Sequence, residues 1–277
     1  TPNMYIMQII NMIGIYIILG IVINVLTGDA AAIGGEIAVN PTVRKVSFTG
    51  STEVGKQLAA DCAPTLKRMS LELGGNAPFM VFDDADLDKA LDLAMGSKFR
   101  NAGQTCICAN RFLVQSGIHD RFVDGLAARV KALRVGNGLD PDTDMGPLIN
   151  ARAVERVDAM VRDAEAKGAR LLVGGHRHAL GGNFYEPTLL TGLKPDMRVF
   201  QGEIFGPVAA VMPFVTEEEA VALANDTSYG LASYVCTRDL ARTWRLFGAL
   251  QYGMVGVNDA TLAAAETPFG GGKYSGL

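Results

Sequence analysis

Hydrophobic and polar residues follow two repeating patterns along most of this chain. Short apolar runs bounded by Gly, Asp or Pro are typical of buried strands, whereas apolar residues spaced three and four apart are typical of amphipathic helices. In residues 86–98, Leu87, Leu91 and Met95 share one helical face, and Asp86 precedes them as a candidate N-cap. The patterns predict strands at residues 24–27, 43–49, 69–73, 78–82, 111–115, 170–173, 207–214, 231–236 and 253–257, and helices at about 53–63, 86–98, 119–133, 151–167, 217–225 and 239–250.

The alternation of strands and helices predicts an α/β fold. Strand–helix–strand units joined by short loops favour a mostly parallel sheet. Residues 1–74 contain too few such units for an intact dinucleotide-binding domain, so we interpret them as part of a Rossmann-like domain. The alternation continues through residues 75–277 as a second α/β domain. Near the start, Gly28-Asp29 and Gly34-Gly35 are interpreted as turns on either side of a short helix.

Residues 4–26 depart from this pattern, because they include no charged side chain and are dominated by Ile and Met. A stretch of this length and apolarity is long enough to span a membrane. It has neither the basic start nor the small-residue cleavage site of a signal peptide, and its amphipathic pattern is weak. We favour a buried helix that leads into the strand at 24–27, with no membrane as partner. A membrane segment and an altered stretch of sequence are the alternatives.

Composition and charge narrow the class of function. The chain has 277 residues, of which 49% are hydrophobic and 19% charged, and its net charge is -4. This balance favours a soluble cytoplasmic enzyme. Lys and Arg are scattered and outnumbered by Asp and Glu, which argues against nucleic acid as a partner. The cysteines lack the C-x-x-C spacing of a zinc site, so we expect no metal and a reducing compartment; they are Cys62, Cys106, Cys108 and Cys236.

The segment Phe99–Arg111, which reads FRNAGQTCICANR, is the first candidate for chemistry. It follows the predicted helix at 86–98 and carries Cys106 and Cys108. A cysteine on such a loop is accessible to substrate and is a candidate nucleophile. The alternative is an idle thiol, since a free cysteine often behaves as a small hydrophobic residue. Gly103 would allow a sharp turn where a side chain would crowd the loop.

Two further segments carry candidate functional groups at the ends of predicted strands, one for phosphate binding and one for general-base catalysis. Residues 50–55 lie where a strand passes into a helix, and the free N–H groups of a helix start attract phosphate. An ordinary strand–helix turn would have the same sequence pattern. Glu72 lies in an apolar strand end, where partial burial would raise its pKa toward the range of a general base. The alternative for Glu72 is a side chain that points to solvent.

Five segments occur in the order found in one enzyme superfamily. They read FTGSTEVGK at 48–56, LELGG at 71–75, GQTC at 103–106, EIFGP at 203–207 and PFGG at 268–271. Together they resemble the aldehyde dehydrogenase superfamily, and FRNAGQTCICANR is most similar to its succinate-semialdehyde dehydrogenase branch. The resemblance covers residues 24–277. It implies a catalytic domain at 75–277 and NAD(P)-dependent oxidation of an aldehyde, with succinate semialdehyde or a similar semialdehyde as substrate.

The resemblance also implies roles for individual residues. Cys106 would attack the aldehyde and form a thiohemiacetal and then a thioester, and Glu72 would activate the water that releases the acid. The first turn of the helix after residue 50 would pack on the cofactor's pyrophosphate, while Glu203 and Phe205 would contact the nicotinamide ribose and ring. The implied NAD- or NADP-binding residues are Gly50, Ser51, Thr52, Glu53, Val54, Gly55, Leu73, Glu203 and Phe205.

Two residues follow the succinate-semialdehyde branch in particular. The counterpart of Arg100 there binds the distal carboxylate of the substrate, a task that suits a guanidinium. The alternative for Arg100 is a charge that interacts with the helix end. Cys108 would form a reversible disulfide with Cys106 under oxidation, or would simply be packed. The run at 263–265 is Ala-Ala-Ala, although some members place a serine in this region.

Some parts of the superfamily pattern have no counterpart in these residues. They are the asparagine that stabilises the oxyanion, the lysine segment that holds the adenosine ribose, and the C-terminal segment that pairs subunits. We therefore expect poor turnover from this chain alone, a homo-oligomer in the full-length form, and no sequence basis for choosing NAD over NADP. The rival interpretations are a cofactor-independent thiol esterase, and an inactive or membrane-tethered fragment.

Overall fold

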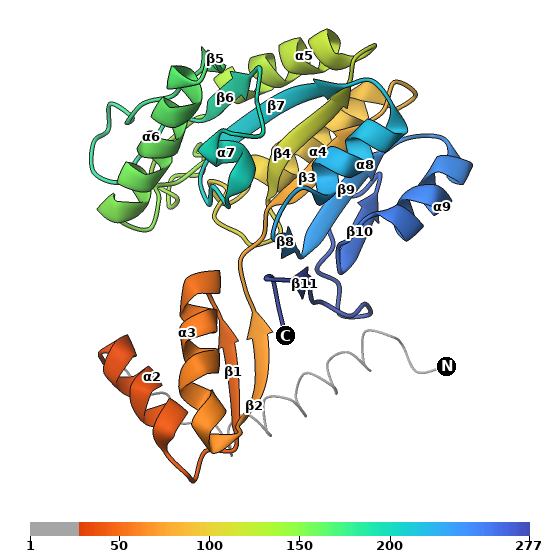
Figure 1. The fold of residues 1–277 in the computed structure, drawn as a ribbon. Helices are drawn as coiled ribbons and strands as arrows, with labels where there is room; N and C mark the ends of the chain where they lie inside the picture. The colour runs from red at the N-terminus through yellow and green to blue at the C-terminus, as the bar shows by residue number, and fades with distance from the viewer. Residues whose placement is uncertain (1–27) are drawn as a thin grey trace, which may run out of the picture.

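The computed structural model describes residues 28–277, so the apolar stretch at 4–26 and the predicted strand at 24–27 lie outside the described residues. The described chain forms two parts, a small one and a larger one (Figure 1). In the small part, two strands pair in parallel and two helices pack beside them. Its elements are α2 (Ala30–Val39), β1 (Lys45–Thr49), α3 (Thr52–Cys62), the 3-10 turn η1 (Ala63–Thr65) and β2 (Arg68–Glu72).

The larger part is built around a seven-stranded sheet with the order β10-β9-β3-β4-β7-β6-β5. All neighbouring strands in it are parallel except β5 and β6. The strands are β3 (Ala77–Val81), β4 (Ala109–Gln115), β5 (Arg170–Val173), β6 (Thr188–Thr191), β7 (Val208–Phe214), β9 (Ala232–Cys236) and β10 (Met254–Val257). A separate antiparallel pair joins β8 (Tyr229–Gly230) to β11 (Gly272–Lys273). The predicted α/β fold with a mostly parallel sheet is confirmed.

The helices of the larger part begin at side-chain caps where the sequence offers them. Asp86 accepts a hydrogen bond from Lys89 N at 3.2 Å, and Asn150 accepts one from Ala153 N at 2.9 Å. No helix within residues 28–277 is long and apolar enough to cross a membrane. The helices are α4 (Leu87–Phe99), α5 (His119–Lys131), α6 (Ala151–Ala166), α7 (Arg198–Gln201), α8 (Glu217–Asn225) and α9 (Leu240–Ala249).

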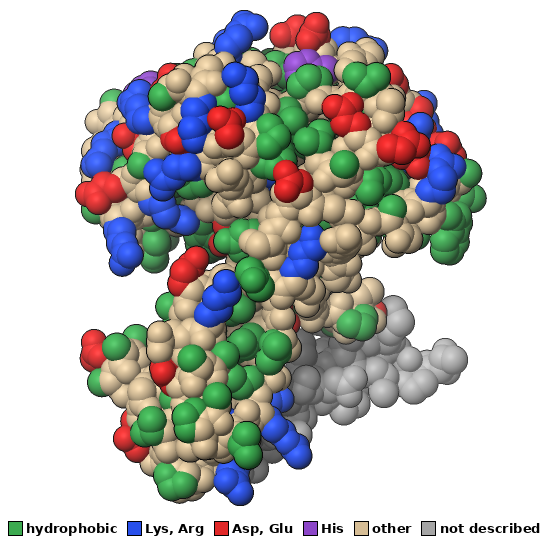
Figure 2. All heavy atoms as spheres, viewed as in Figure 1, with side chains coloured by type: hydrophobic (Ala, Val, Ile, Leu, Met, Phe, Trp, Pro, Cys, Tyr) green, Lys and Arg blue, Asp and Glu red, His purple; other side chains and the backbone are tan. Residues whose placement is uncertain are grey.

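The two parts have separate hydrophobic cores. The extensive core of the larger part surrounds the seven-stranded sheet, whereas Ala38, Val46 and Cys62 form a small core between the helices and strands of the small part. The molecule narrows between the two parts (Figure 2), and the chain crosses there from β2 to β3. The boundary between residues 1–74 and 75–277 stays a prediction.

The structure corrects one local prediction and adds elements that were not predicted. Gly34 and Gly35 do not form a turn, because both lie inside α2. That helix starts at Asp29, which accepts from Ala32 N at 2.7 Å, and it continues to Val39, just before Pro41. A Cβ on either glycine would meet no atom closer than 3.9 Å, so the pair is not required by close packing. The elements that were not predicted are η1, β6, α7, β8 and β11, each of four residues or fewer.

Candidate active site

A cavity of about 620 Å³ lies where the two parts meet. It is bounded by the carboxyl ends of β1 and β2 and by the segments that precede β3, β4 and β7. Ligands of open parallel sheets bind at the carboxyl ends of the strands, and the small part presents that edge here. The lining residues are Thr49, Gly50, Ser51, Glu72, Leu73, Gly74, Gln104, Thr105, Cys106, Arg156, Glu203 and Phe205.

The loop that carries Cys106 is held by close backbone contacts. Gly103 has a φ of 71°, and a Cβ there would lie 2.1 Å from the carbonyl oxygen of Gly206. A Cβ on Gly75 would lie 2.1 Å from the carbonyl oxygen of Cys106 itself. Both approaches involve backbone atoms, which cannot rotate aside as a side chain can. The segments before β3, β4 and β7 can therefore meet only because glycine occupies these two positions.

We expect Gly75→Ala to destabilise the folded chain and to displace Cys106. Overpacking of this kind typically costs about 1–3 kcal/mol. The matched control is Gly96→Ala, because Gly96 lies in α4 with no atom within 4 Å of an added Cβ. That control should be neutral or should stabilise the helix by about 0.5–1 kcal/mol. Urea unfolding of the two variants measures the difference, and equal free energies of unfolding would contradict the steric account.

Cys106 and Glu72 are both partly buried in this cavity. Burial raises the pKa of the Cys106 thiol, and the nearby negative charge of Glu203 raises it further. Burial also raises the pKa of Glu72, whose Oε2 is buried and has no hydrogen-bond partner within residues 28–277. A buried acceptor without a partner is costly unless something else supplies a proton. The arrangement suits a thiol nucleophile and a carboxylate that accepts a proton from a bound water or substrate.

Glu203 and Phe205 enter the cavity from the segment before β7. Glu203 Oε1 accepts a hydrogen bond from Gly75 N at 3.1 Å. Burial raises the pKa of Glu203 to about 7, although this hydrogen bond and the charge of Arg156 oppose the shift. Phe205 has a φ of 48°, which is an uncommon conformation for a residue other than glycine. Such backbone outliers concentrate at functional sites, where surrounding contacts hold them.

The raised pKa of Glu203 gives an expected pH dependence of stability. The folded chain binds this proton more tightly than the unfolded chain, whose ordinary carboxyl pKa is 4.5. The stabilisation from protonation is therefore complete below about pH 4.5 and is lost as the pH rises through about 7. Relative to Glu203→Gln, the wild-type chain should lose stability over that window. Urea unfolding at about pH 5 and about pH 8 measures this, with the exposed Glu155→Gln as control. Parallel pH profiles for wild type and Glu203→Gln would contradict it.

The start of α3 lies beside the cavity. Ser51 caps the helix by accepting a hydrogen bond from Val54 N at 3.3 Å, and Gly50 and Ser51 both line the cavity. Thr52 and Glu53 line an adjoining cavity of about 360 Å³. Two predicted cofactor residues do not line either cavity: Val54 is exposed, and Gly55 packs so closely on Leu73 that a Cβ would approach its side chain to 2.4 Å.

Arg100 and Cys108 are not brought into the cavity. Arg100 directly follows α4 and is exposed to solvent. Cys108 is buried, and its Sγ lies 3.5 Å from Lys98 Nζ. The predicted roles of Arg100 in substrate binding and of Cys108 in a disulfide with Cys106 stay predictions.

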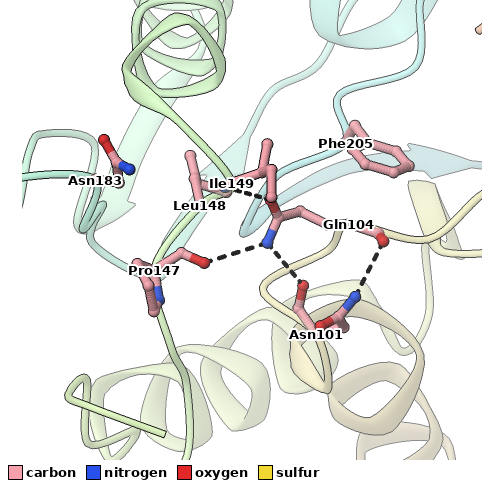
Figure 3. A pocket seen from close by; sticks show the side chains of 7 residues that line it. All are labelled: Asn101, Gln104, Pro147, Leu148, Ile149, Asn183 and Phe205. Atoms are coloured by element: carbon pink, nitrogen blue, oxygen red, sulfur yellow. Dashed lines mark hydrogen bonds between the residues drawn. The ribbon is translucent and has the colours of Figure 1, made fainter. Parts of the chain in front are cut away.

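Five lining residues were not among the predicted site residues: Thr49, Gly74, Gln104, Thr105 and Arg156. Two of them make contacts that connect separate parts of the site. Gln104 connects the nucleophile loop to the segment before α6: its Nε2 donates to the carbonyl oxygens of Asn101 and Pro147 at 3.3 Å, and its Oε1 accepts from Ile149 N at 2.9 Å (Figure 3). Arg156 comes from α6 and donates to the carbonyl oxygen of Glu203 at 3.4 Å. Gln104 stands inside a segment that the sequence did single out, whereas no local pattern distinguishes Arg156 from other charged residues of its helix.

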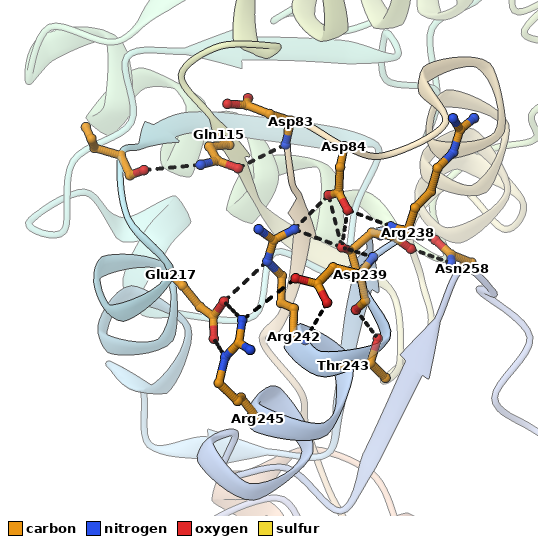
Figure 4. A network of polar contacts seen from close by, with 12 residues as sticks. Asp83, Asp84, Gln115, Glu217, Arg238, Asp239, Arg242, Thr243, Arg245 and Asn258 are labelled. Atoms are coloured by element: carbon orange, nitrogen blue, oxygen red, sulfur yellow. Dashed lines mark hydrogen bonds and ion pairs between the residues drawn. The ribbon is translucent and has the colours of Figure 1, made fainter.

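A network of ion pairs and hydrogen bonds lies at the carboxyl ends of the strands in the large sheet (Figure 4). Arg242 Nη1 donates to Asp84 at 2.7 Å, just beyond the carboxyl end of β3. Glu217, at the start of α8, accepts from Arg242 Nε at 3.3 Å and from Arg245 at 2.7 Å. The charged side chains of this network are hydrogen-bonded to one another. The predicted catalytic pair, Glu72 and Cys106, lies at the amino ends of these strands, in the segments that precede β3 and β4.

The fold and the lining of the cavity agree with a known enzyme family. A model of the aldehyde dehydrogenase family matches residues 20–277. The chain belongs to this family.

Individual relatives resemble the chain over most of its length. It is 52% identical over 255 residues to the mitochondrial succinate-semialdehyde dehydrogenase of Oryza sativa subsp. japonica, an alignment that covers 92% of this chain and 48% of that protein. A crystal structure of an E. coli NADP dependent enzyme matches with a TM-score of 0.90 and 52% identity, over 92% of this chain and 53% of the other. Betaine aldehyde dehydrogenase from Staphylococcus aureus, solved in complex with NAD+, matches with a TM-score of 0.88 and 40% identity, over 91% and 51%. The chain thus spans about half the length of the relatives it matches.

Proposed function

We propose that the complete protein oxidises an aldehyde to a carboxylic acid with NAD or NADP, through a thioester on Cys106. The observation that carries this proposal is one cavity lined by a thiol, a carboxylate and residues of both predicted cofactor segments. The family membership supports the same reaction class. Within residues 28–277, no three His, Cys, Asp or Glu side chains are grouped so that they could hold a metal ion.

Cys106 and Glu72 divide the proposed chemistry between two steps. The Cys106 thiolate attacks the aldehyde carbon, and the backbone N–H of Cys106 would donate to the oxyanion that develops. Loss of a hydride from this adduct leaves a thioester on Sγ. Glu72, whose raised pKa makes it a better base than an exposed carboxylate, then takes a proton from the water that hydrolyses the thioester. Covalent catalysis in this form replaces one difficult oxidation by two easier steps.

The residues at the cavity fit the nicotinamide end of a dinucleotide. The N–H groups at the start of α3 suit a phosphate, and the Glu203 carboxylate suits the hydroxyls of a ribose. Gly74 leaves room for this carboxylate, because a Cβ there would lie 2.8 Å from Glu203 Oε2. When bound, the nicotinamide would supply the hydride acceptor. An E. coli relative described as NADP dependent and a Staphylococcus aureus relative solved with NAD+ support both cofactors as candidates.

The decisive experiment measures formation of reduced cofactor in a full-length chimera, with the remaining half taken from the E. coli relative. We expect aldehyde-dependent reduction of NAD or NADP. Ester hydrolysis that needs no dinucleotide, without any aldehyde-dependent reduction, would replace this proposal by a thiol esterase. The cytoplasmic location and the homo-oligomer stay predictions, and the rice relative is described as mitochondrial.

We further propose a semialdehyde with a distal carboxylate as substrate, as the name of the rice relative supports. Arg100 does not line the cavity, but it is exposed and directly precedes the nucleophile loop, and a guanidinium there would pair with such a carboxylate. In the chimera, Arg100→Leu should raise the KM for succinate semialdehyde by about 10–100-fold and leave the KM for a neutral aldehyde of similar length almost unchanged. Arg121→Leu, on the exposed side of α5, is the control for loss of a surface charge. Equal changes for both substrates would assign Arg100 a structural role.

A further inference from the structure

Lys98 and Cys108 form a buried pair beside the predicted nucleophile. The two side chains approach to 3.5 Å between Nζ and Sγ, and Lys98 is 0% exposed. Within residues 28–277, the thiol is the one hydrogen-bond partner of Lys98 Nζ, which makes no salt bridge. Lysine is seldom buried completely unless its charge is paired. The buried amine of Lys98 therefore depends on its contact with the thiol of Cys108.

The pair joins the two ends of the nucleophile loop. Lys98 lies in the last turn of α4, and Cys108 directly precedes β4. A second contact fixes the same place, because Ala109 N donates to Ser97 Oγ at 3.1 Å. The loop that carries Cys106 thus starts and ends at neighbouring points. A bond between Lys98 and Cys108 would close this loop without moving either element far.

We propose that Lys98 and Cys108 are an oxidative modification site, at which a peroxide joins Lys98 Nζ to Cys108 Sγ. In the first step, the sulfur of Cys108 attacks the peroxide; an S–O bond forms, the O–O bond breaks and one water leaves. In the second step, the nitrogen of Lys98 attacks the sulfenic sulfur; an S–N bond forms, the S–O bond breaks, and the hydroxyl leaves with a proton from the nitrogen as a second water. One thiol, one amine and one peroxide become one sulfenamide and two waters. The sulfur is oxidised and the peroxide oxygens are reduced.

Three features favour this product over the reactions open to an isolated buried thiol. The amine is already in contact with the sulfur, so capture of the sulfenic acid needs no diffusion. Burial raises the pKa of Cys108, and the charge and hydrogen bond of Lys98 partly oppose this rise. The Sγ of Cys108 also donates to the carbonyl oxygen of Lys98 at 3.8 Å, and this contact holds the sulfur beside the lysine. The cross-link would compete with a Cys106–Cys108 disulfide and would leave the Cys106 thiol free.

The test uses the 277-residue chain and hydrogen peroxide, and it is independent of aldehyde oxidation. After mild treatment of the folded chain, tryptic peptides are analysed by mass spectrometry without reduction. We expect peptide 90–100, uncleaved at Lys98, to be joined to peptide 101–111 with the net loss of two hydrogen atoms. A thiol reductant should separate them. The buried Cys62 and Cys236 are internal controls, since neither has a lysine Nζ within hydrogen-bond distance among the described residues.

Variants make the assignment specific. Cys106→Ala removes the competing disulfide and should increase the yield of the joined peptides, whereas Lys98→Met and Cys108→Ser should abolish them. A joined product that retains one oxygen atom between nitrogen and sulfur would also support the site, since it connects the same two side chains. Recovery of Cys108 only as a free thiol, as a sulfinic acid or in a disulfide with Cys106 would overturn the proposal. The wild-type peptide map decides the question even if a variant fails to fold.

Discussion

Replacing Cys106 with Ala is expected to abolish both aldehyde oxidation and ester hydrolysis in the full-length chimera, with losses on the order of 10⁴-fold or more. The reason is that both reactions would pass through an acyl group on the same sulfur. Cys106 lines the cavity together with Glu72 and Glu203, and the other described cysteines do not. An alanine would remove the nucleophile but leave the cavity open to substrate and cofactor.

The control for Cys106→Ala is Cys108→Ala, because it removes a thiol only two residues away. Cys108 is buried and does not line the cavity, so this variant should keep most of both activities. Steady-state rates with an aldehyde and an activated ester separate the two variants, and a dinucleotide-binding measurement checks that Cys106→Ala still folds around its cofactor. Retention of either activity above a trace in Cys106→Ala would remove Cys106 from the nucleophile role.

The fold class was predictable because the periodicity of apolar residues is a local property. Ala90, Leu91 and Ala94 are buried on one face of α4, and β3 is buried throughout, as its continuous apolar run indicated. Strand ends were predicted to within two residues where Gly or Pro bounded the run. The elements that escaped prediction are too short to display a period. Gly34 and Gly35 were misinterpreted because a glycine pair favours a turn only when the residues around it do not continue a helix.

Part of the candidate site could also be predicted, because the family segments are contiguous in sequence. Cys106, Glu72, Glu203 and Phe205 belong to such segments, and the structure gathers them around one cavity. Arg156 could not be predicted, since it reaches the cavity from the middle of an amphipathic helix whose charged residues look alike. The burial of Lys98 could not be predicted either, because a lysine in the last turn of a helix is ordinarily solvated beside the free carbonyl groups.

The second large effect is expected from Glu72→Gln, which should separate the two halves of the proposed reaction. The amide has nearly the shape of the carboxylate but cannot accept a proton, so acylation of Cys106 should proceed while hydrolysis of the thioester slows by about 10²–10⁴-fold. Rapid mixing of the chimera with aldehyde and cofactor should then give one burst of NADH or NADPH per site, followed by slow turnover. Glu155→Gln, which removes an exposed carboxylate from α6, should show wild-type kinetics. If the burst disappears together with the steady-state rate, Glu72 acts before or during acylation. Its Oε2, which has no hydrogen-bond partner within residues 28–277, would then serve to activate the thiol of Cys106.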